Sequence, residues 1–113
     1  MDYKDFGLVN TNQMFAHASA NHYAVPAFNF YNMETLSAII SAARDMHSPV
    51  ILAVSESALK YMGPDLLMGM IWGLNLKPEY GDALHLDHGA SFDACVNAIK
   101  LGFSSVMIDG SKL

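Results

Sequence analysis

The chain alternates between short apolar runs and segments in which apolar residues recur every three or four positions. The apolar runs at 50–54, 83–87 and 104–109 predict strands, and a further strand is expected within 22–30, with Pro26 near its start. The run at 50–54 (VILAV) has no polar alternation, so both of its faces are expected to be buried. Such a run is typical of a parallel strand between layers of helices.

Helix-forming segments flank these runs. Helices are expected at about residues 11–20, 32–48, 64–74 and 91–102. Thr11, Asn32 and Ser91 are predicted N-caps, because their side chains can accept hydrogen bonds from the first turn, and Ser57 is also expected to be a cap. From the first strand onward the order is β-α-β-α-β-α-β, which predicts an α/β fold with a parallel sheet.

Composition and charge narrow the class of protein. Hydrophobic residues make up 52% of the chain and charged residues only 15%, against roughly 25% charged residues in a typical globular domain. Disorder is excluded, and some of the surface is expected to be covered by another part. Six basic and eleven acidic residues give a net charge of -5 with no basic cluster, which argues against nucleic-acid binding. The single cysteine, Cys95, excludes an internal disulfide.

The sequence contains no targeting or membrane-spanning signal. No apolar run approaches the roughly 18–20 residues that cross a bilayer, and the acidic start at 1–5 is unlike a signal peptide. We therefore expect a cytoplasmic protein with no membrane partner. Because there is no repeat or linker, residues 1–113 are expected to form a single domain.

Polar residues follow the carboxyl end of every predicted strand. They are Asn29, the segment 55–57 (SES), Asp87 with His88, and Asp109. Ligands bind at this end of parallel α/β sheets and barrels, although helix N-caps favour the same residue types and explain part of the cluster. Asp87 beside His88 suits a general acid–base next to a metal ligand, with a cap followed by an exposed histidine as the simpler interpretation.

Two other side chains near this cluster have simpler interpretations. Strand alternation puts His85 on the face of Asp87, where a hydrogen-bonded core histidine is favoured over a further metal ligand. Cys95 is expected on the buried side of its helix with no basic neighbour in sequence, so a nucleophilic role is not expected.

Longer motifs carry a resemblance to a known family. Residues 83–89 (ALHLDHG) and 102–111 (GFSSVMIDGS) resemble the class II, metal-dependent ketose-bisphosphate aldolases. Upstream, 23–30 (YAVPAFNF) and 48–52 (SPVIL) match the same family in order and spacing. The resemblance spans nearly the whole chain and is weakest at 65–82.

This resemblance implies a (β/α)₈ TIM barrel, of which the chain supplies the N-terminal half with about four parallel strands and intervening helices. It implies zinc-dependent cleavage of a small phosphorylated sugar, fructose 1,6-bisphosphate or its tagatose epimer, to dihydroxyacetone phosphate and glyceraldehyde 3-phosphate. Zinc would polarise the ketose carbonyl, so no Schiff-base lysine is required. The family's other two zinc histidines would lie beyond Leu113, because a catalytic zinc normally has three protein ligands.

The resemblance also implies a role for each polar strand-end residue. Asp87 would carry the proton of the C4 hydroxyl, and His88 would be a zinc ligand. Asp109 would lie at the periphery of the metal site, as an alternative or second-metal ligand. Asn29 would hold the dihydroxyacetone portion, and Ser55 would contact the substrate or its distal phosphate.

Two other functions remain open. The first is a catalytically silent half-barrel that self-associates or pairs with another chain. The second, a small redox or nucleotide-binding protein, is disfavoured because the chain has neither CxxC nor GxGxxG. Since strands of a half-barrel lack partners, we expect the neighbours of 50–54 and 104–109 to be exposed, and the chain to be marginally stable or a homo-oligomer.

Overall fold

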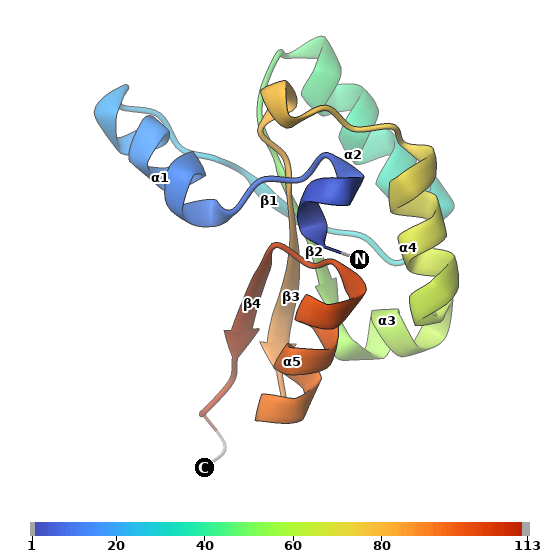
Figure 1. Ribbon diagram of the computed structural model, residues 1–113. Helices are drawn as coiled ribbons and strands as arrows, with labels where there is room; N and C mark the ends of the chain where they lie inside the picture. The colour runs from blue at the N-terminus through green and yellow to red at the C-terminus, as the bar shows by residue number, and fades with distance from the viewer. Residues whose placement is uncertain (1, 112–113) are drawn as a thin grey trace.

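The computed structural model describes residues 2–111 and contains one parallel sheet with the strand order β1-β2-β3-β4 (Figure 1). The strands are β1 (Ala27–Asn29), β2 (Ile51–Ser55), β3 (Ala83–Gly89) and β4 (Ser105–Ile108). The α-helices are α1 (Thr11–Ala20), α2 (Met33–Asp45), α3 (Glu56–Met62), α4 (Pro64–Gly73) and α5 (Phe92–Leu101), and the 3-10 helices are η1 (Tyr3–Phe6) and η2 (Pro78–Tyr80). The predicted α/β fold with four parallel strands is confirmed.

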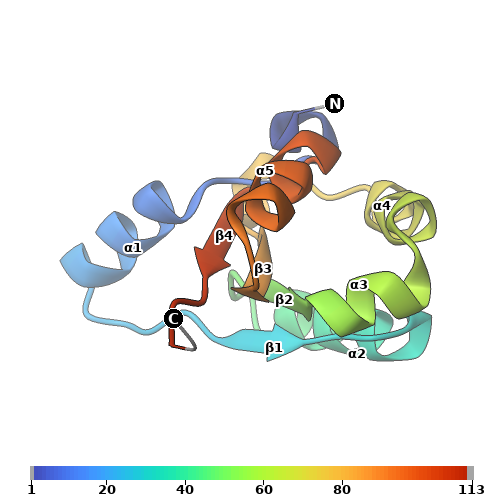
Figure 2. The same ribbon diagram turned by 90° about the horizontal axis from the view of Figure 1, so that it is seen from below.

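Helices cover the sheet unequally on its two sides. Helices α2 to α5 lie on one side, whereas α1 lies on the other (Figure 2). The larger cluster of buried side chains, which includes Leu52, fills the space between the sheet and α2 to α5. A smaller cluster joins Met14 of α1 to Ile51 and Ala83 at the amino end of the sheet. Strand β2 is therefore covered on both sides, as the run at 50–54 predicts.

The two edge strands differ from the central ones in exposure. Every residue of β1 is exposed, and β4 is half-buried with Ile108 exposed. Strand β2 is paired with β1 and β3, so the expectation that the neighbours of 50–54 are exposed is confirmed for β1 but wrong for β3, which is mostly buried. For 104–109, the exposure is confirmed along β4.

Strand β1 is shorter than the segment 22–30 predicted. Its ladder with β2 runs from Ala27 to Asn29 only, and ahead of it the Pro26 carbonyl accepts a hydrogen bond from Ile51 N–H at 2.9 Å. Proline has no N–H to donate, so the ladder cannot continue normally through this position.

Helix α3 is the element that the sequence pattern missed. Ser57 lies inside it and is not a cap, whereas Ser55 is its N-cap and accepts a hydrogen bond from Ala58 N–H at 3.2 Å. No residue of α3 is fully buried, and its apolar face (Ala58, Leu59 and Met62) packs only partly buried against the core, so this seven-residue helix gives a weak periodic signal. Two helices, α3 and α4, therefore connect β2 to β3 instead of one.

The remaining helix boundaries follow their caps. Asn32 and Ser91 are N-caps as predicted, and Gly102 ends α5 at φ 120°. For α1 the cap is Asn10 rather than Thr11, which is the first helical residue. None of the helices within residues 2–111 is long and apolar enough to cross a membrane.

Candidate functional site at the carboxyl ends of the strands

The register of the sheet gathers the predicted polar residues on one side. Ser55 of β2 pairs with Asp87 of β3. Two residues earlier on β2, Ala53 pairs with Asn29 of β1 on one side and with His85 of β3 on the other. Paired residues of parallel strands project to the same side, and alternation puts these positions on the side of Ile51, which faces α1. Asn29, Ser55 and Asp87 therefore share the side of the sheet opposite to α2 to α5.

Strands β3 and β4 bring two carboxylates and two histidines together. Asp87 Oδ1 lies 3.7 Å from His88 Nε2 and 4.0 Å from His85 Nε2. His88 Nδ1 lies 3.1 Å from Asp109 Oδ2 and is its hydrogen-bond partner. Three of the five sequence-predicted site residues, Asp87, His88 and Asp109, thus form one cluster.

His88 reaches Asp109 from an unusual backbone conformation. The β3–β4 pairing is irregular between Leu86 and Gly89, and His88 has φ 55°. Few residues other than glycine adopt this left-handed region. In the tautomer that donates Nδ1–H to the Asp109 carboxylate, His88 keeps its Nε2 lone pair for a ligand, which is the usual arrangement of metal-binding histidines.

Asp109 is held as a carboxylate. Hydrogen bonds from the Ser111 hydroxyl and backbone N–H, and from His88, lower the pKa of Asp109 to about 2. Ser111 is not among the site residues predicted from the sequence, although Asp-Gly-Ser is a turn pattern in which an aspartate commonly accepts from the residue two positions later. Asp109 is therefore negatively charged at neutral pH.

His85 is the hydrogen-bonded histidine that the sequence favours. Its Nδ1 lies 2.7 Å from Ser105 Oγ across the β3–β4 pair. Burial lowers the pKa of His85, and the nearby charge of Asp87 opposes this shift only in part. A neutral imidazole therefore lies beside Asp87. The partner Ser105 was not predicted, because the register that pairs the two strands is not visible in the sequence.

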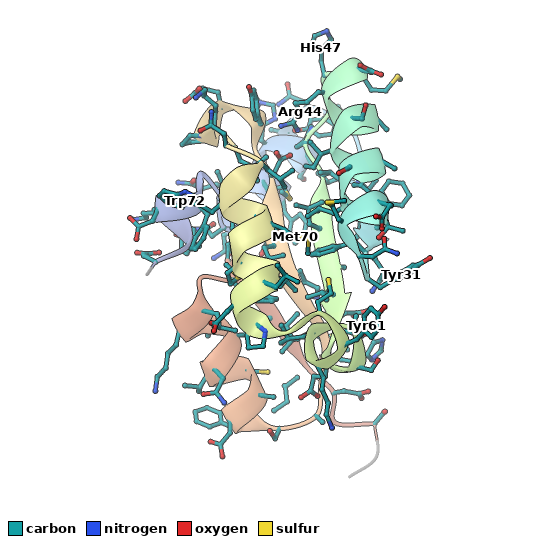
Figure 3. All side chains as sticks on the ribbon, turned by 90° about the vertical axis from the view of Figure 1, so that its right-hand side faces the viewer. Tyr31, Arg44, His47, Tyr61, Met70 and Trp72 are labelled. Carbon is teal, nitrogen blue, oxygen red and sulfur yellow. The ribbon has the colours of Figure 1, made fainter. Side chains whose placement is uncertain are left out.

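Ser55 is the register neighbour of Asp87, but neither Ser55 nor Asn29 makes a side-chain hydrogen bond to the charged cluster within residues 2–111. Ser55 Oγ is 3.2 Å from Ser57 Oγ and lines an open hollow of about 480 Å³ with residues of α3 and of the segment after β1. Tyr31 and Tyr61 flank this hollow and lie toward the same end of the molecule (Figure 3). Asn29 is exposed at the end of β1 and makes no side-chain hydrogen bond within residues 2–111.

The cluster suits zinc in the type of its donors but not in their number. Imidazole and carboxylate are both zinc ligands. Within residues 2–111, however, no group of three His, Cys, Asp or Glu side chains could hold a metal ion. A catalytic zinc site normally needs three protein ligands, so the described residues do not complete one.

Comparison with known families decides which proteins share this arrangement. Residues 9–113 match the family model described as fructose-bisphosphate aldolase class-II. The chain belongs to this family. Relatives named fructose-bisphosphate aldolase include one from Treponema pallidum, 50% identical over 98% of this chain and 35% of its own length. Another, from Helicobacter pylori, is 46% identical over 92% of this chain and 34% of its own length. The chain thus spans about a third of these aldolases.

Solved aldolase structures share the fold. The YdjI aldolase from Escherichia coli K12 has a TM-score of 0.83 and 29% identity over 94% of this chain and 41% of its own. The fructose-bisphosphate aldolase of Campylobacter jejuni has a TM-score of 0.77 and 25% identity over 95% of this chain and 39% of its own. These class II aldolases are TIM barrels, and this chain, with its four strands, covers about 40% of each of them.

Proposed function

We propose that this protein acts as a class II ketose-bisphosphate aldolase, a lyase that reversibly cleaves fructose 1,6-bisphosphate to dihydroxyacetone phosphate and glyceraldehyde 3-phosphate. Tagatose 1,6-bisphosphate is the epimeric alternative. The observation that carries the proposal is the cluster of Asp87, His88 and Asp109 at the carboxyl ends of β3 and β4, the end at which barrel enzymes bind substrate.

Asp87 is proposed as the base that takes the proton of the C4 hydroxyl. As the C3–C4 bond breaks, its electron pair passes toward the C2 carbonyl of the dihydroxyacetone portion, and an aldehyde forms at C4. Two features support this role. The Asp87 carboxylate accepts no hydrogen bond within residues 2–111, and 28% of the side chain is exposed, so its oxygens can reach a substrate.

We propose zinc as the metal, with His88 Nε2 as one ligand and the other ligands outside residues 2–111. When bound, zinc would supply a Lewis acid that polarises the ketose carbonyl. Asp109, already engaged with His88, orients this imidazole and lies at the periphery of the metal site, where it is the alternative or second-metal ligand.

Asn29 and Ser55 are proposed as substrate contacts. Asn29 would hold the dihydroxyacetone portion through its free amide, which can both donate and accept hydrogen bonds. Ser55, with Ser57 beside it in the hollow of about 480 Å³, would contact the substrate or its distal phosphate. We further propose a cytoplasmic protein in which residues 1–113 form a single domain.

The second candidate is a catalytically silent partner that forms a homo-oligomer or pairs with another chain. The specific observation in its favour is an apolar groove of about 560 Å³ along β1 and α2, which contains Phe28, 53% exposed, and lies away from the charged cluster. Sedimentation equilibrium distinguishes the two functions when combined with activity, because a silent partner associates without cleaving substrate.

The test is fructose 1,6-bisphosphate cleavage by the purified protein, with zinc and with a chelator. The proposal predicts cleavage that the chelator abolishes. Replacing Asp87 with Asn should lower kcat by roughly 10²–10⁴-fold, the usual contribution of a general base. Folded protein that binds zinc but cleaves neither epimer would contradict the aldolase proposal and favour the silent partner.

A further inference from the structure

Glu56 links two of the segments that follow the strands. It is the first residue of α3, and its Oε2 accepts a hydrogen bond of 2.6 Å from the N–H of Ala90, which follows β3. This short distance is typical of a hydrogen bond to an ionised acceptor. No other side-chain hydrogen bond within residues 2–111 joins the segment after β2 to the segment after β3.

The peptide unit between Gly89 and Ala90 is held at both of its polar atoms. On the β4 side the Gly89 carbonyl accepts from Asp109 N–H at 2.8 Å, and on the α3 side the Ala90 N–H donates to Glu56. Because a peptide unit is planar, two hydrogen bonds on its opposite edges fix its orientation.

The surroundings of Gly89 leave this peptide little freedom. A Cβ at Gly89 would lie 2.8 Å from Cys95 Sγ and 2.9 Å from the Met107 carbonyl oxygen. The backbone therefore passes closer to α5 and β4 here than any residue with a side chain would allow. The position of the peptide is set by packing, and its two hydrogen bonds set its rotation.

The residue immediately before this unit is the strained one. His88 has φ 55°, a conformation that persists in a residue other than glycine only where neighbouring structure holds it. Rotation of the Gly89–Ala90 peptide would change ψ of Gly89 and break its hydrogen bond from Asp109 N–H, and the chain after His88 would then be free to let His88 return to an extended conformation. Its ring would then leave Asp109, which lies 3.1 Å from Nδ1, and would move relative to Asp87.

We propose that Glu56 is a positioning residue: by holding the Gly89–Ala90 peptide it keeps His88 in its left-handed conformation and so sets the direction of the His88 ring. The conformational effect stands on the contacts above, whereas its catalytic consequence rests on the proposed function. Within residues 2–111 the Glu56 side chain makes no hydrogen bond or ion pair with His88, and its hydrogen bond goes to the backbone of Ala90, so it acts through the backbone.

The experiment compares three variants of the full chain by NMR. Glu56→Ala removes the acceptor, and Glu56→Gln keeps an amide oxygen in its place. Glu34→Ala is the matched control, because Glu34 lies in the first turn of α2 and its side chain makes no hydrogen bond within residues 2–111. The readouts are the hydrogen-exchange rate of the Ala90 amide, the His88 backbone coupling constant that reports φ, and the ring shifts of His88.

In Glu56→Ala, Ala90 should exchange about tenfold faster or more, as expected for one lost hydrogen bond, and the His88 coupling and ring shifts should change. Glu56→Gln should restore most of both, and Glu34→Ala should change neither. An unchanged His88 in Glu56→Ala, or the same changes in Glu34→Ala, would overturn the positioning role.

The catalytic consequence has a separate readout. In protein that cleaves fructose 1,6-bisphosphate, Glu56→Ala should lower kcat by about tenfold with little change in KM, and Glu56→Gln should recover most of kcat. An unchanged kcat would overturn this consequence. Failure of the wild-type protein to cleave either epimer would count against the proposed function alone, since the NMR comparison decides the positioning role without it.

Discussion

Asp82 and Asp87 lie at opposite ends of β3 and have opposite surroundings. Asp82, just before the strand, is completely buried and accepts hydrogen bonds of 2.7 Å from both terminal nitrogens of Arg44 and one of 3.3 Å from Val50 N–H. Asp87, near the carboxyl end, is 28% exposed, and its closest titratable neighbours are the His88 and His85 Nε2 atoms at 3.7 and 4.0 Å.

The partner of Asp82 is equally well held. The Arg44 guanidinium donates to the Ser48 carbonyl at 3.3 Å and lies over the Tyr80 ring, 4.1 Å from its centre. The hydrogen bond to Asp82 raises the pKa of Arg44 against the opposing effect of desolvation. Arg44 lies at the end of α2 far from Tyr31, and so far from the candidate site (Figure 3).

This difference separates charges that hold the fold from charges that remain available to a ligand. A buried carboxylate whose hydrogen bonds are satisfied by its own protein has nothing left to offer a substrate. A partly exposed carboxylate that accepts no hydrogen bond from the described residues can still accept one from a substrate. In barrel proteins the amino end of the strands contributes to stability and the carboxyl end carries the chemistry. Asp82, just before β3, is an aspartate of the first kind, and Asp87, near the carboxyl end of β3, is one of the second kind.

Of the substitutions that test this difference between Asp82 and Asp87, Arg44→Leu is expected to change the free energy of unfolding most. It leaves the Asp82 carboxylate buried without its counter-ion, which should lower the free energy of unfolding by about 3–5 kcal/mol. Urea denaturation measures this change. The control Lys60→Leu removes an exposed cation of α3 and should stay within about 0.5 kcal/mol. A loss below about 1 kcal/mol in Arg44→Leu would show that the Arg44–Asp82 ion pair does not stabilise the amino end of the sheet.

A smaller effect, on the pKa of Asp109, is expected at the carboxyl end of the strands. There the Asp109 carboxylate accepts hydrogen bonds, whereas that of Asp87 accepts none within residues 2–111. Folding lowers the pKa of Asp109 from 3.8 to about 2, so its ionised form stabilises the fold above about pH 4, and this contribution is lost as the pH falls through about 2. Ser111→Ala should raise the pKa of Asp109, measured by carboxyl ¹³C NMR, whereas Ser41→Ala on exposed α2 should not. Titration of Asp109 near 3.8 in the unsubstituted protein would contradict the hydrogen-bond assignment.

The sequence predicted those elements whose signals are local. Apolar runs and capping residues are read within a few positions, and they located β2, β3, β4 and four of the five α-helices. Helix α3 was missed because it is only seven residues long and none of its residues is fully buried. Ser55 was interpreted only as a substrate contact, although it also caps that helix. The parallel direction of the strands likewise follows from these patterns, because helices alternate with the strands, whereas the residue-by-residue register does not.

The features that the sequence did not predict, in the fold and in the candidate site, depend on contacts between distant segments. The pairs Arg44–Asp82 and Glu56–Ala90 are separated by 38 and 34 positions, and no local pattern specifies either. The left-handed backbone of His88 is also invisible, because it depends on the irregular pairing of β3 with β4. The motif did identify Asp87, His88 and Asp109 as neighbours, because strand ends of a parallel sheet meet at one edge.

The most direct test of this division between fold-stabilising and ligand-accessible carboxylates compares the free energy of unfolding of Asp87→Asn with that of Asp82→Asn. Both are measured by urea denaturation under the same conditions. Both variants replace a carboxylate with an amide of the same shape. The account predicts that Asp82→Asn loses about 2 kcal/mol or more, because the bonds to Arg44 weaken inside the protein. Asp87→Asn should stay within about 0.5 kcal/mol of the unsubstituted protein. An equal loss in the two variants would contradict the account, since Asp87 would then hold the fold as Asp82 does.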